Sequence, residues 1–274
     1  MSPHSPNRSL PGVFTRPAAP PDHVIRYGDH ADQVIDVRRE GARPDAPVVV
    51  LLHGGFWQAA YDRCHTRPMA DDLARRGYVV CTPEYRRVGQ PGGGYPGTFD
   101  DVAAAVDAVL ADPPAGGPVV LAGHSAGGHL AMWAALRHRL PVASRWYAGP
   151  PAREGARGHV LGCVALAPVA DLGGAIAAGL GDGACRDLIG GRLDRLAETD
   201  PMRLLPYGRG RLVIVHGAED RVVPVDIARR FAAREPSTTF VELRDTGHFG
   251  LIDPLSRSWP SVVDAIGSVA RPSR

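Results

Sequence analysis

The stretch that decides the fold is Val119–Leu130, which reads VVLAGHSAGGHL. An apolar run is followed by a turn of small residues and then by a segment with helical spacing. In the turn, Gly123, Ser125 and Gly127 match the pattern Gly-x-Ser-x-Gly of a nucleophile elbow, where a strand reverses sharply into a helix. The pattern predicts that the Ser125 hydroxyl is presented at the end of a strand. It also places the Ala126 N–H at a helix N-terminus, where it can bind an oxyanion.

The bulk composition fits one globular α/β domain. The chain has 274 residues, of which 44% are hydrophobic, and a formal net charge of +2. This small charge gives no basis for binding nucleic acid or an acidic membrane surface. No stretch reaches the roughly 18 apolar residues that span a bilayer, and the N-terminus lacks the apolar core of a signal peptide. We therefore expect a cytoplasmic protein with no membrane partner.

The sequence carries no recognisable set of metal ligands, and it contains no lysine. A lysine nucleophile or Schiff base is therefore excluded. The four cysteines lack the spacing of metal ligands or of a redox motif; they are Cys64, Cys81, Cys163 and Cys185. We expect neither a metal nor a cofactor.

Apolar runs and helical segments alternate along the chain from residue 48 onwards. Strands are predicted at 48–53, 78–82, 119 to the elbow, 160–167, 212–216 and 239–243, and helices at 67–76, 99–110, from the elbow to about 140, 225–233 and 259–269. This alternation is typical of an α/β fold, with a doubly wound, mostly parallel sheet and helices on both faces. Two short strands at 23–27 and 33–38 are expected to form a hairpin ahead of it.

Three local features complete this organisation. Residues 1–22 are rich in Pro, Ser and Arg, which indicates a flexible N-terminal arm, and residues 23–274 are expected to form a single domain. Residues 172–207 are helix-like, irregular and rich in glycine, which suits a small helical cap or lid inserted over the sheet. Thr98 is expected to cap the helix that follows it, with Asp101 as an acid in its first turn.

A serine hydroxyl needs a base and an orienting acid before it can attack a carbonyl. In an open parallel sheet, these partners lie on loops that follow the carboxyl ends of strands. Asp220 lies between the strand at 212–216 and a helix, and His248 follows the last strand after a glycine. Glu219 and Asp171 are alternative acids, and Asp220 has the alternative role of a helix cap. The chain order Ser, Asp, His is that of the α/β hydrolases.

Other side chains near these motifs receive structural roles. His53 and His216 end strands, where their rings are expected to bond loop backbone groups. His129 lies one helical turn beyond Ser125 and is expected to pack or bond beneath the site. Arg86 follows a strand end beside the His53 loop, and we expect it to pair with a carboxylate that holds the loop.

From about residue 23 to residue 269 the sequence resembles the α/β-hydrolase superfamily. The run His53-Gly54-Gly55-Phe56-Trp57 is similar to the His-Gly-Gly-x-Trp motif of kynurenine formamidases (arylformamidases) and of related small esterases. Hormone-sensitive-lipase-like esterases usually carry a further glycine where Phe56 stands, which favours the formamidase-like branch. The resemblance implies an oxyanion hole formed by the N–H groups of Gly55, Phe56 and Ala126.

Together these residues predict a serine hydrolase that works by two-step acyl transfer. Its substrate is expected to be a small molecule, with carboxylic esters first, N-formyl aryl amides such as N-formylkynurenine second and peptides third. Trp57, Tyr85 and Phe56 either line the substrate pocket or pack in the core against the strand ends. A hypothesis of another class is a non-catalytic ligand receptor on the hydrolase fold. The sequence leaves open whether the chain forms a homodimer.

Overall fold

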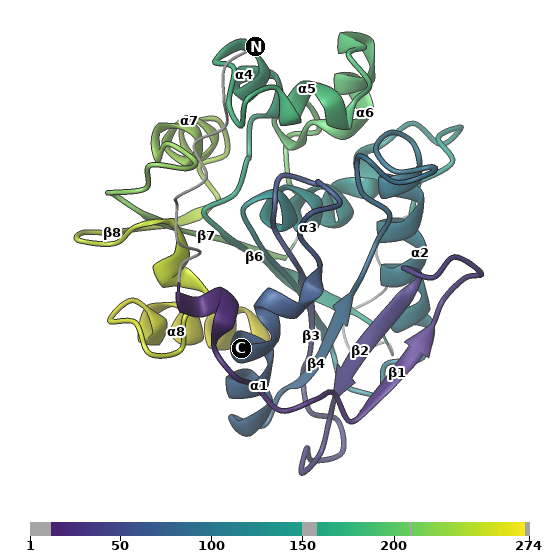
Figure 1. The fold of residues 1–274 in the computed structure, drawn as a ribbon, viewed down its shortest axis with the longest axis vertical. Helices are drawn as coiled ribbons and strands as arrows, with labels where there is room; N and C mark the ends of the chain where they lie inside the picture. Colours follow the sequence, from purple (N-terminus) through teal and green to yellow (C-terminus); the bar gives the residue numbers. More distant parts are fainter. Residues whose placement is uncertain (1–11, 150–157, 209, 272–274) are drawn as a thin grey trace.

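A computed structural model describes residues 12–149, 158–208 and 210–271 (Figure 1). Its centre is an eight-stranded sheet with the order β1-β2-β4-β3-β5-β6-β7-β8. The strands are β1 (His23–Arg26), β2 (Val34–Arg38), β3 (Val48–Leu52), β4 (Val79–Pro83), β5 (Val119–His124), β6 (Val160–Leu166), β7 (Arg211–Gly217) and β8 (Thr239–Leu243). The predicted hairpin of β1 and β2 pairs antiparallel with β4, and the remaining strands are parallel. The predicted fold class is confirmed.

Helices cover both faces of the sheet because its central strands are apolar on both sides. The longer helices are α1 (Arg67–Arg75), α2 (Gly97–Ala111), α3 (Ala126–Leu136), α7 (Asp226–Arg234) and α8 (Trp259–Ala270). Val48 and Val50 of β3 pack with residues of α2, α3 and α7, whereas Val49 and Leu51 pack with residues of α1 and α8. This alternation follows from the two-residue period of a strand.

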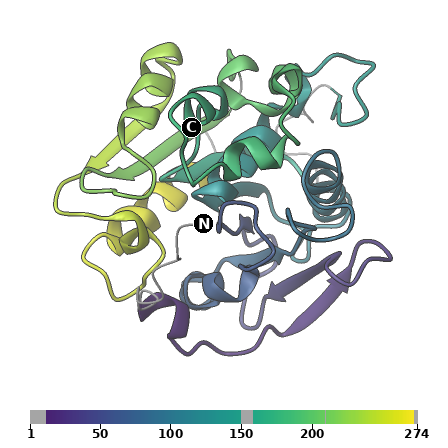
Figure 2. The ribbon, with the colours of Figure 1, turned by 45° about the horizontal axis from the view of Figure 1, so that its top comes forward.

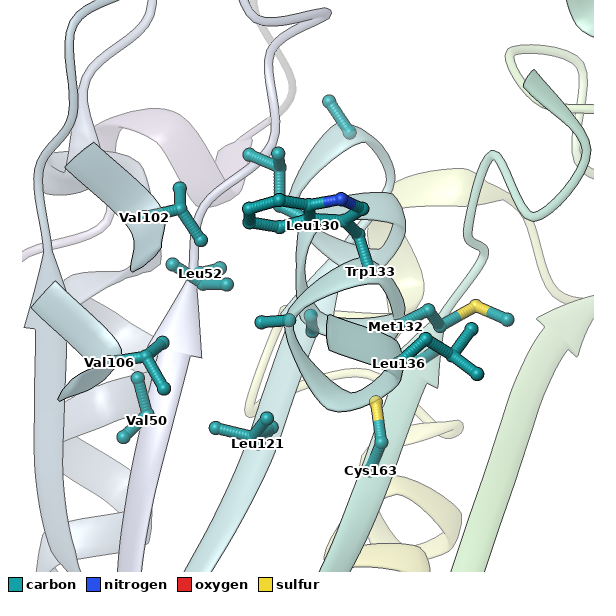
Figure 3. Close-up of a cluster of buried hydrophobic side chains, with 14 of the residues drawn as sticks. Val50, Leu52, Val102, Val106, Leu121, Leu130, Met132, Trp133, Leu136 and Cys163 are labelled. Atoms are coloured by element: carbon teal, nitrogen blue, oxygen red, sulfur yellow. The ribbon is translucent and has the colours of Figure 1, made fainter. Parts of the chain in front are cut away.

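The α3 helix rests directly on the strands that carry the site. Figure 3 shows Leu130, Met132, Trp133 and Leu136 of α3 above Leu121 of β5 and its neighbours, and all five side chains are buried. Because α3 begins one residue after Ser125, this packing fixes the elbow against the centre of the sheet.

Residues 172–207, where a cap was expected, form short helices beyond the carboxyl end of β6 (Figures 1 and 2). They are α4 (Leu172–Ala177), α5 (Ala184–Leu188), η4 (Leu193–Arg195), α6 (Leu196–Thr199) and η5 (Pro201–Arg203). Hydrogen bonds tie them to the layer below: Trp133 donates its indole N–H to the Glu198 carbonyl at 2.8 Å, and Tyr95 donates its hydroxyl to the Glu198 carboxylate at 2.6 Å. The segment is thus anchored to α3 and to the loop before α2.

Two predictions about local structure are wrong. Residues 12–22, expected to belong to a flexible arm, pack on the domain: η1 (Gly12–Thr15) buries Val13, and the Arg38 guanidinium donates to the carbonyls of Ala19 and Pro20, both at 2.6 Å. Residues 1–11 of that arm lie outside the described residues. A segment with little periodicity still folds when distant partners satisfy its few apolar and polar groups.

Thr98 does not cap α2. The helix begins at Gly97 with Pro96 at the N-cap, and the Thr98 hydroxyl donates to the Arg86 carbonyl at 2.6 Å instead. Asp101 is not the acid of the first turn, a place taken by Asp100. The tertiary partner at Arg86 therefore outweighs the local capping preference. Within the described residues, no helix is long and apolar enough to cross a membrane.

Candidate active site

Ser125 lies between β5 and α3 in a strained left-handed conformation, with φ 58° and ψ −120°. The glycines on either side are required by close approach. A Cβ on Gly123 would lie 2.1 Å from the Gly127 carbonyl oxygen, and a Cβ on Gly127 would lie 2.1 Å from the Leu52 carbonyl oxygen. Ala126 is the first residue of α3, where a backbone N–H has no partner within the helix. The local structure is the nucleophile elbow that the sequence predicts.

Asp220 and His248, predicted as acid and base, are in contact. Asp220 follows β7, and His248 begins the 3₁₀ helix η6 (His248–Leu251) after β8. Nδ1 of His248 lies 2.6 Å from Oδ2 of Asp220, and both side chains are almost fully buried. Because a carboxylate only accepts, Nδ1 carries a proton and Nε2 is the nitrogen that can accept one.

The surroundings of Asp220 keep its carboxylate charged. Burial raises its pKa, but hydrogen bonds from His216 and His248 and from the Val223 N–H more than offset this and lower the pKa below its usual range. Oδ1 also accepts the N–H groups of Val222 and Val223, each at 2.8 Å. A charged, immobile Asp220 orients the His248 ring and can stabilise its protonated form.

A hydrogen bond from a second histidine, His124, connects His248 to the end of β5. His124, the last residue of β5, donates from Nε2 to the His248 carbonyl at 3.0 Å, and the two rings lie 4.4 Å apart between centroids. Burial, together with the neighbouring His248, lowers the pKa of His124 well below its ordinary value. His124 is therefore a neutral donor that brings the His248 backbone next to Ser125.

The loop after β3 lies directly against Ser125. A Cβ on Gly54 would lie 2.8 Å from the His124 carbonyl oxygen and 3.2 Å from Cβ of Ser125. The next three residues, Gly55, Phe56 and Trp57, all have positive φ, at 104°, 51° and 56°. This run of positive φ angles turns the chain directly after the point where Gly54 approaches Ser125.

A buried carboxylate that the sequence reasoning did not single out holds this loop. Oε1 of Glu84 lies 2.8 Å from Nε2 of His53, and Oε2 accepts the Arg63 N–H at 2.9 Å. Burial raises the pKa of Glu84, but the charge and hydrogen bond of His53 and the nearby Arg87 guanidinium lower it to about 2. Glu84 is therefore charged at neutral pH. The sequence signal was its place at the end of a buried strand, next to the loop that begins at His53.

Trp57 and Tyr85, considered as pocket or core residues, lie in the core. Both are 0% exposed. Tyr85 stacks on the His53 ring at 4.3 Å and donates its hydroxyl to the His53 carbonyl at 2.7 Å. Phe56 is partly exposed and faces the cap, where a Cβ on Gly181 would lie 2.6 Å from its ring. Of the three aromatic residues, Phe56 alone has surface to offer to a substrate.

The structural roles predicted for three histidines are confirmed. His53 bonds the Gly54 carbonyl, His216 the Val223 carbonyl, and His129 the Thr199 carbonyl of the cap, at 2.8–2.9 Å. Arg86 pairs with a carboxylate, as predicted: Asp101 of α2 accepts hydrogen bonds from its Nη2 and Nε at 2.7 and 2.8 Å.

The alternative acids stand apart from the base. Asp171 caps α4 through the Gly174 N–H at 2.8 Å and lies 3.5 Å from the Arg230 guanidinium. Glu219 is exposed. Asp220 is therefore the carboxylate that contacts the His248 ring.

Residues 35–234 match the model of the family BD-FAE. The chain belongs to the BD-FAE family. The matched range contains Ser125 and Asp220 and ends before His248. The family match thus covers most of the sheet and the turn at Ser125.

Two curated relatives of this BD-FAE chain come from Mycobacterium tuberculosis. Esterase LipC is 27% identical over 245 residues, which are 84% of this chain and 60% of LipC. The probable carboxylic ester hydrolase LipM is 32% identical over 131 residues, which are 44% of this chain and 29% of LipM. The matched region therefore spans less than two thirds of the length of each relative.

Solved structures show the same fold at low identity. A bifunctional GH43-CE protein of Bacteroides eggerthii matches with a TM-score of 0.73 and 20% identity, over 90% of this chain and 38% of its own. Inhibited esterase B of Lactobacillus rhamnosis matches with a TM-score of 0.71 and 20% identity, over 94% of this chain and 89% of its own. The BD-FAE chain therefore has the α/β-hydrolase fold.

Proposed function

We propose that this chain is a carboxylic ester hydrolase that acts through an acyl-enzyme on Ser125. The observation that carries the proposal is the 2.6 Å contact between Asp220 and His248, held beside a strained nucleophile elbow by the His124 bond. The names of the two mycobacterial relatives, an esterase and a probable carboxylic ester hydrolase, support ester chemistry.

In the first step, Nε2 of His248 takes the proton of Ser125 while Oγ attacks the carbonyl carbon. Asp220 holds the ring in the tautomer that can accept this proton. The oxyanion is bound by the N–H groups of Ala126, Gly55 and Phe56, each contributing about 2.7–4 kcal/mol to the barrier reduction. His248 then protonates the leaving alcohol, and in the second step it activates the water that releases the acid.

The second candidate is an aryl formamidase, and in particular a kynurenine formamidase. The motif His53 to Trp57 favours it, since it matches His-Gly-Gly-x-Trp. The mechanism is unchanged, with an aryl amine in place of the alcohol as leaving group. The names of the relatives favour esters, so the formamide stands second.

The test compares rates on short p-nitrophenyl esters and on N-formylkynurenine for the wild type and for Ser125→Ala. We expect hydrolysis of the ester and its loss in the variant; a Ser125→Ala protein with the wild-type rate would refute the mechanism. A faster reaction with the formamide than with any ester would replace the first candidate by the second. A fluorophosphonate probe should label Ser125, whereas a non-catalytic receptor would remain unlabelled.

A further inference from the structure

The short helix η1 contacts the two loops that carry the proposed base and the proposed oxyanion donors. Val13 is 3% exposed and packs in the core beneath α1 and α8. Phe14, the next residue, is partly exposed and lies among aromatic rings of both loops. Its ring meets Phe249 edge-on at 5.4 Å and stacks on His65 at 4.9 Å.

On the side of the base, η1 and the residue that follows it contact η6 and the segment beyond it. Phe249 directly follows His248, and the two rings lie 5.0 Å apart at 85°. Beyond the other end of η6, Nη2 of Arg16 lies 2.6 Å from Oδ2 of Asp253, and both side chains are largely shielded, with 27% and 21% exposed. A shift of η1 would therefore move the segment on which His248 stands.

On the side of the oxyanion loop, the contacts pass through His65 and Tyr61. His65 meets the His53 ring edge-on at 5.8 Å. Tyr61 lies 6.1 Å from the Phe14 ring, and its Cβ is 2.3 Å from where a Cβ on Gly55 would stand. Tyr61 thus packs against the backbone of Gly55, one of the proposed oxyanion donors.

The sheet itself does not join these two loops directly. The oxyanion loop follows β3, whereas the base follows β8, and the strands β5, β6 and β7 lie between them. Acyl transfer needs base and oxyanion donors at one spacing around a single carbonyl, and a displacement of about 1 Å costs about 100-fold in rate. A brace between the loops therefore bears on turnover.

We propose that η1 is a strap that sets the spacing of these two loops, with Phe14 and Arg16 as positioning residues for the hydrolytic reaction. This inference rests on the proposed function. Neither residue touches the reacting atoms, since each acts through the loop it contacts. The strap comes from the segment whose composition suggested a flexible arm.

The test compares Phe14→Ala, Phe14→Tyr and the wild type in steady-state ester hydrolysis and in thermal melting. Phe14→Ala is expected to lower kcat by about 10- to 100-fold with little change in KM, and to shift the acidic limb of the pH–rate profile that reports His248. Phe14→Tyr keeps the ring contacts and should restore kcat. A Phe14→Ala protein with the kcat and pH profile of the wild type would overturn the proposal.

The ion pair gives an independent arm that leaves the aromatic contacts intact, which matters if Phe14→Ala does not fold. Arg16→Ala, Asp253→Ala and the double variant should all lower kcat, because each breaks the ion pair; Asp253→Ala also removes the carboxylate that accepts the Leu255 N–H at 2.9 Å. Arg75→Ala is the matched control, because it breaks an ion pair with Asp71 that lies within α1. Equal kcat in Arg16→Ala and Arg75→Ala would overturn the role of the Arg16–Asp253 pair.

A readout without turnover separates the strap from the proposed function. The proton of the His248–Asp220 hydrogen bond should give a downfield NMR resonance that broadens in Phe14→Ala and returns in Phe14→Tyr. An unchanged resonance in Phe14→Ala would contradict the strap even if the wild type hydrolyses esters. A wild type that neither hydrolyses esters nor labels with a fluorophosphonate would refute the proposed function, while broadening in Phe14→Ala would still support the strap.

Discussion

The substitution Asp220→Asn tests the proposed triad sharply, because the surroundings dictate how the new amide must sit. Oδ1 of Asp220 accepts two backbone N–H groups, of Val222 and Val223, while Oδ2 faces Nδ1 of His248 and lies 3.3 Å from Nε2 of His216. An asparagine must keep its oxygen toward the backbone groups, since its NH2 group would otherwise face them donor to donor. The NH2 group then points at His248.

This orientation reverses the tautomer of the base. Nδ1 of His248 must accept from the amide, so the ring carries its proton on Nε2 and cannot take the proton of Ser125. The same change in a Ser-His-Asp protease lowers kcat by about 10⁴-fold, or about 5.4 kcal/mol of transition-state stabilisation. Folding stability should change far less, because both backbone N–H groups stay bonded. An alanine would leave each of them unsatisfied at a cost of about 1–3 kcal/mol.

The assay is kcat for a short p-nitrophenyl ester, with the thermal midpoint measured on the same preparation. Asp171→Asn is the matched control, because Asp171 caps α4 and its partners are Gly174 and Arg230 rather than a histidine. We expect the control to keep the wild-type kcat and Asp220→Asn to lose about four decades. A loss of less than about one decade would refute the tautomer argument.

Two further predictions concern groups around the triad. Glu84→Gln removes the charge that faces His53 and should lower kcat by about 10- to 100-fold, the equivalent of about 1.5–3 kcal/mol for a charged hydrogen bond; a wild-type kcat in a correctly folded variant would contradict this. Burial lowers the pKa of His65 and His129 from 6.5 to about 4. Between these pH values the unfolded chain binds more protons than the folded chain. The free energy of unfolding should therefore decrease as the pH is lowered from about 6.5 to about 4, by about 3 kcal/mol for each ring. Urea midpoints across this range would stay constant if the reasoning is wrong.

The sheet and the proposed triad could be predicted because their signals are local. Each central strand is a continuous apolar run, and Ser125 and Asp220 each follow one of these runs, whereas His248 follows the edge strand β8. The rules for parallel sheets then place their loops at one edge, whatever the details of packing. The structural roles of His53 and His216 followed from the same reasoning, since a histidine at a strand end has loop carbonyls within reach. That of His129 followed from its place in α3, one helical turn beyond Ser125.

The supporting contacts could not be predicted because their partners are distant in sequence. Glu84 holds the His53 loop across 31 residues, and Phe14 reaches Phe249 across most of the chain. A Val-Phe pair among prolines and arginines has no periodicity, so the composition indicated a flexible arm where the structure has a segment anchored by the buried Val13. The prediction that Thr98 caps α2 was wrong for a related reason. Its hydroxyl donates to the Arg86 carbonyl, a tertiary contact that local capping rules do not consider.

The position of β8 in the sheet bears on how this protein loses activity. Ser125 follows β5, which is flanked by β3 and β6 and wholly buried, whereas His248 follows β8, an edge strand with partly exposed residues. Local opening of an edge element costs only part of the global unfolding free energy. Detachment of β8 would carry away the base while the nucleophile stays in a folded centre. Heat inactivation would then reflect local opening of the edge strand β8 rather than unfolding of the core.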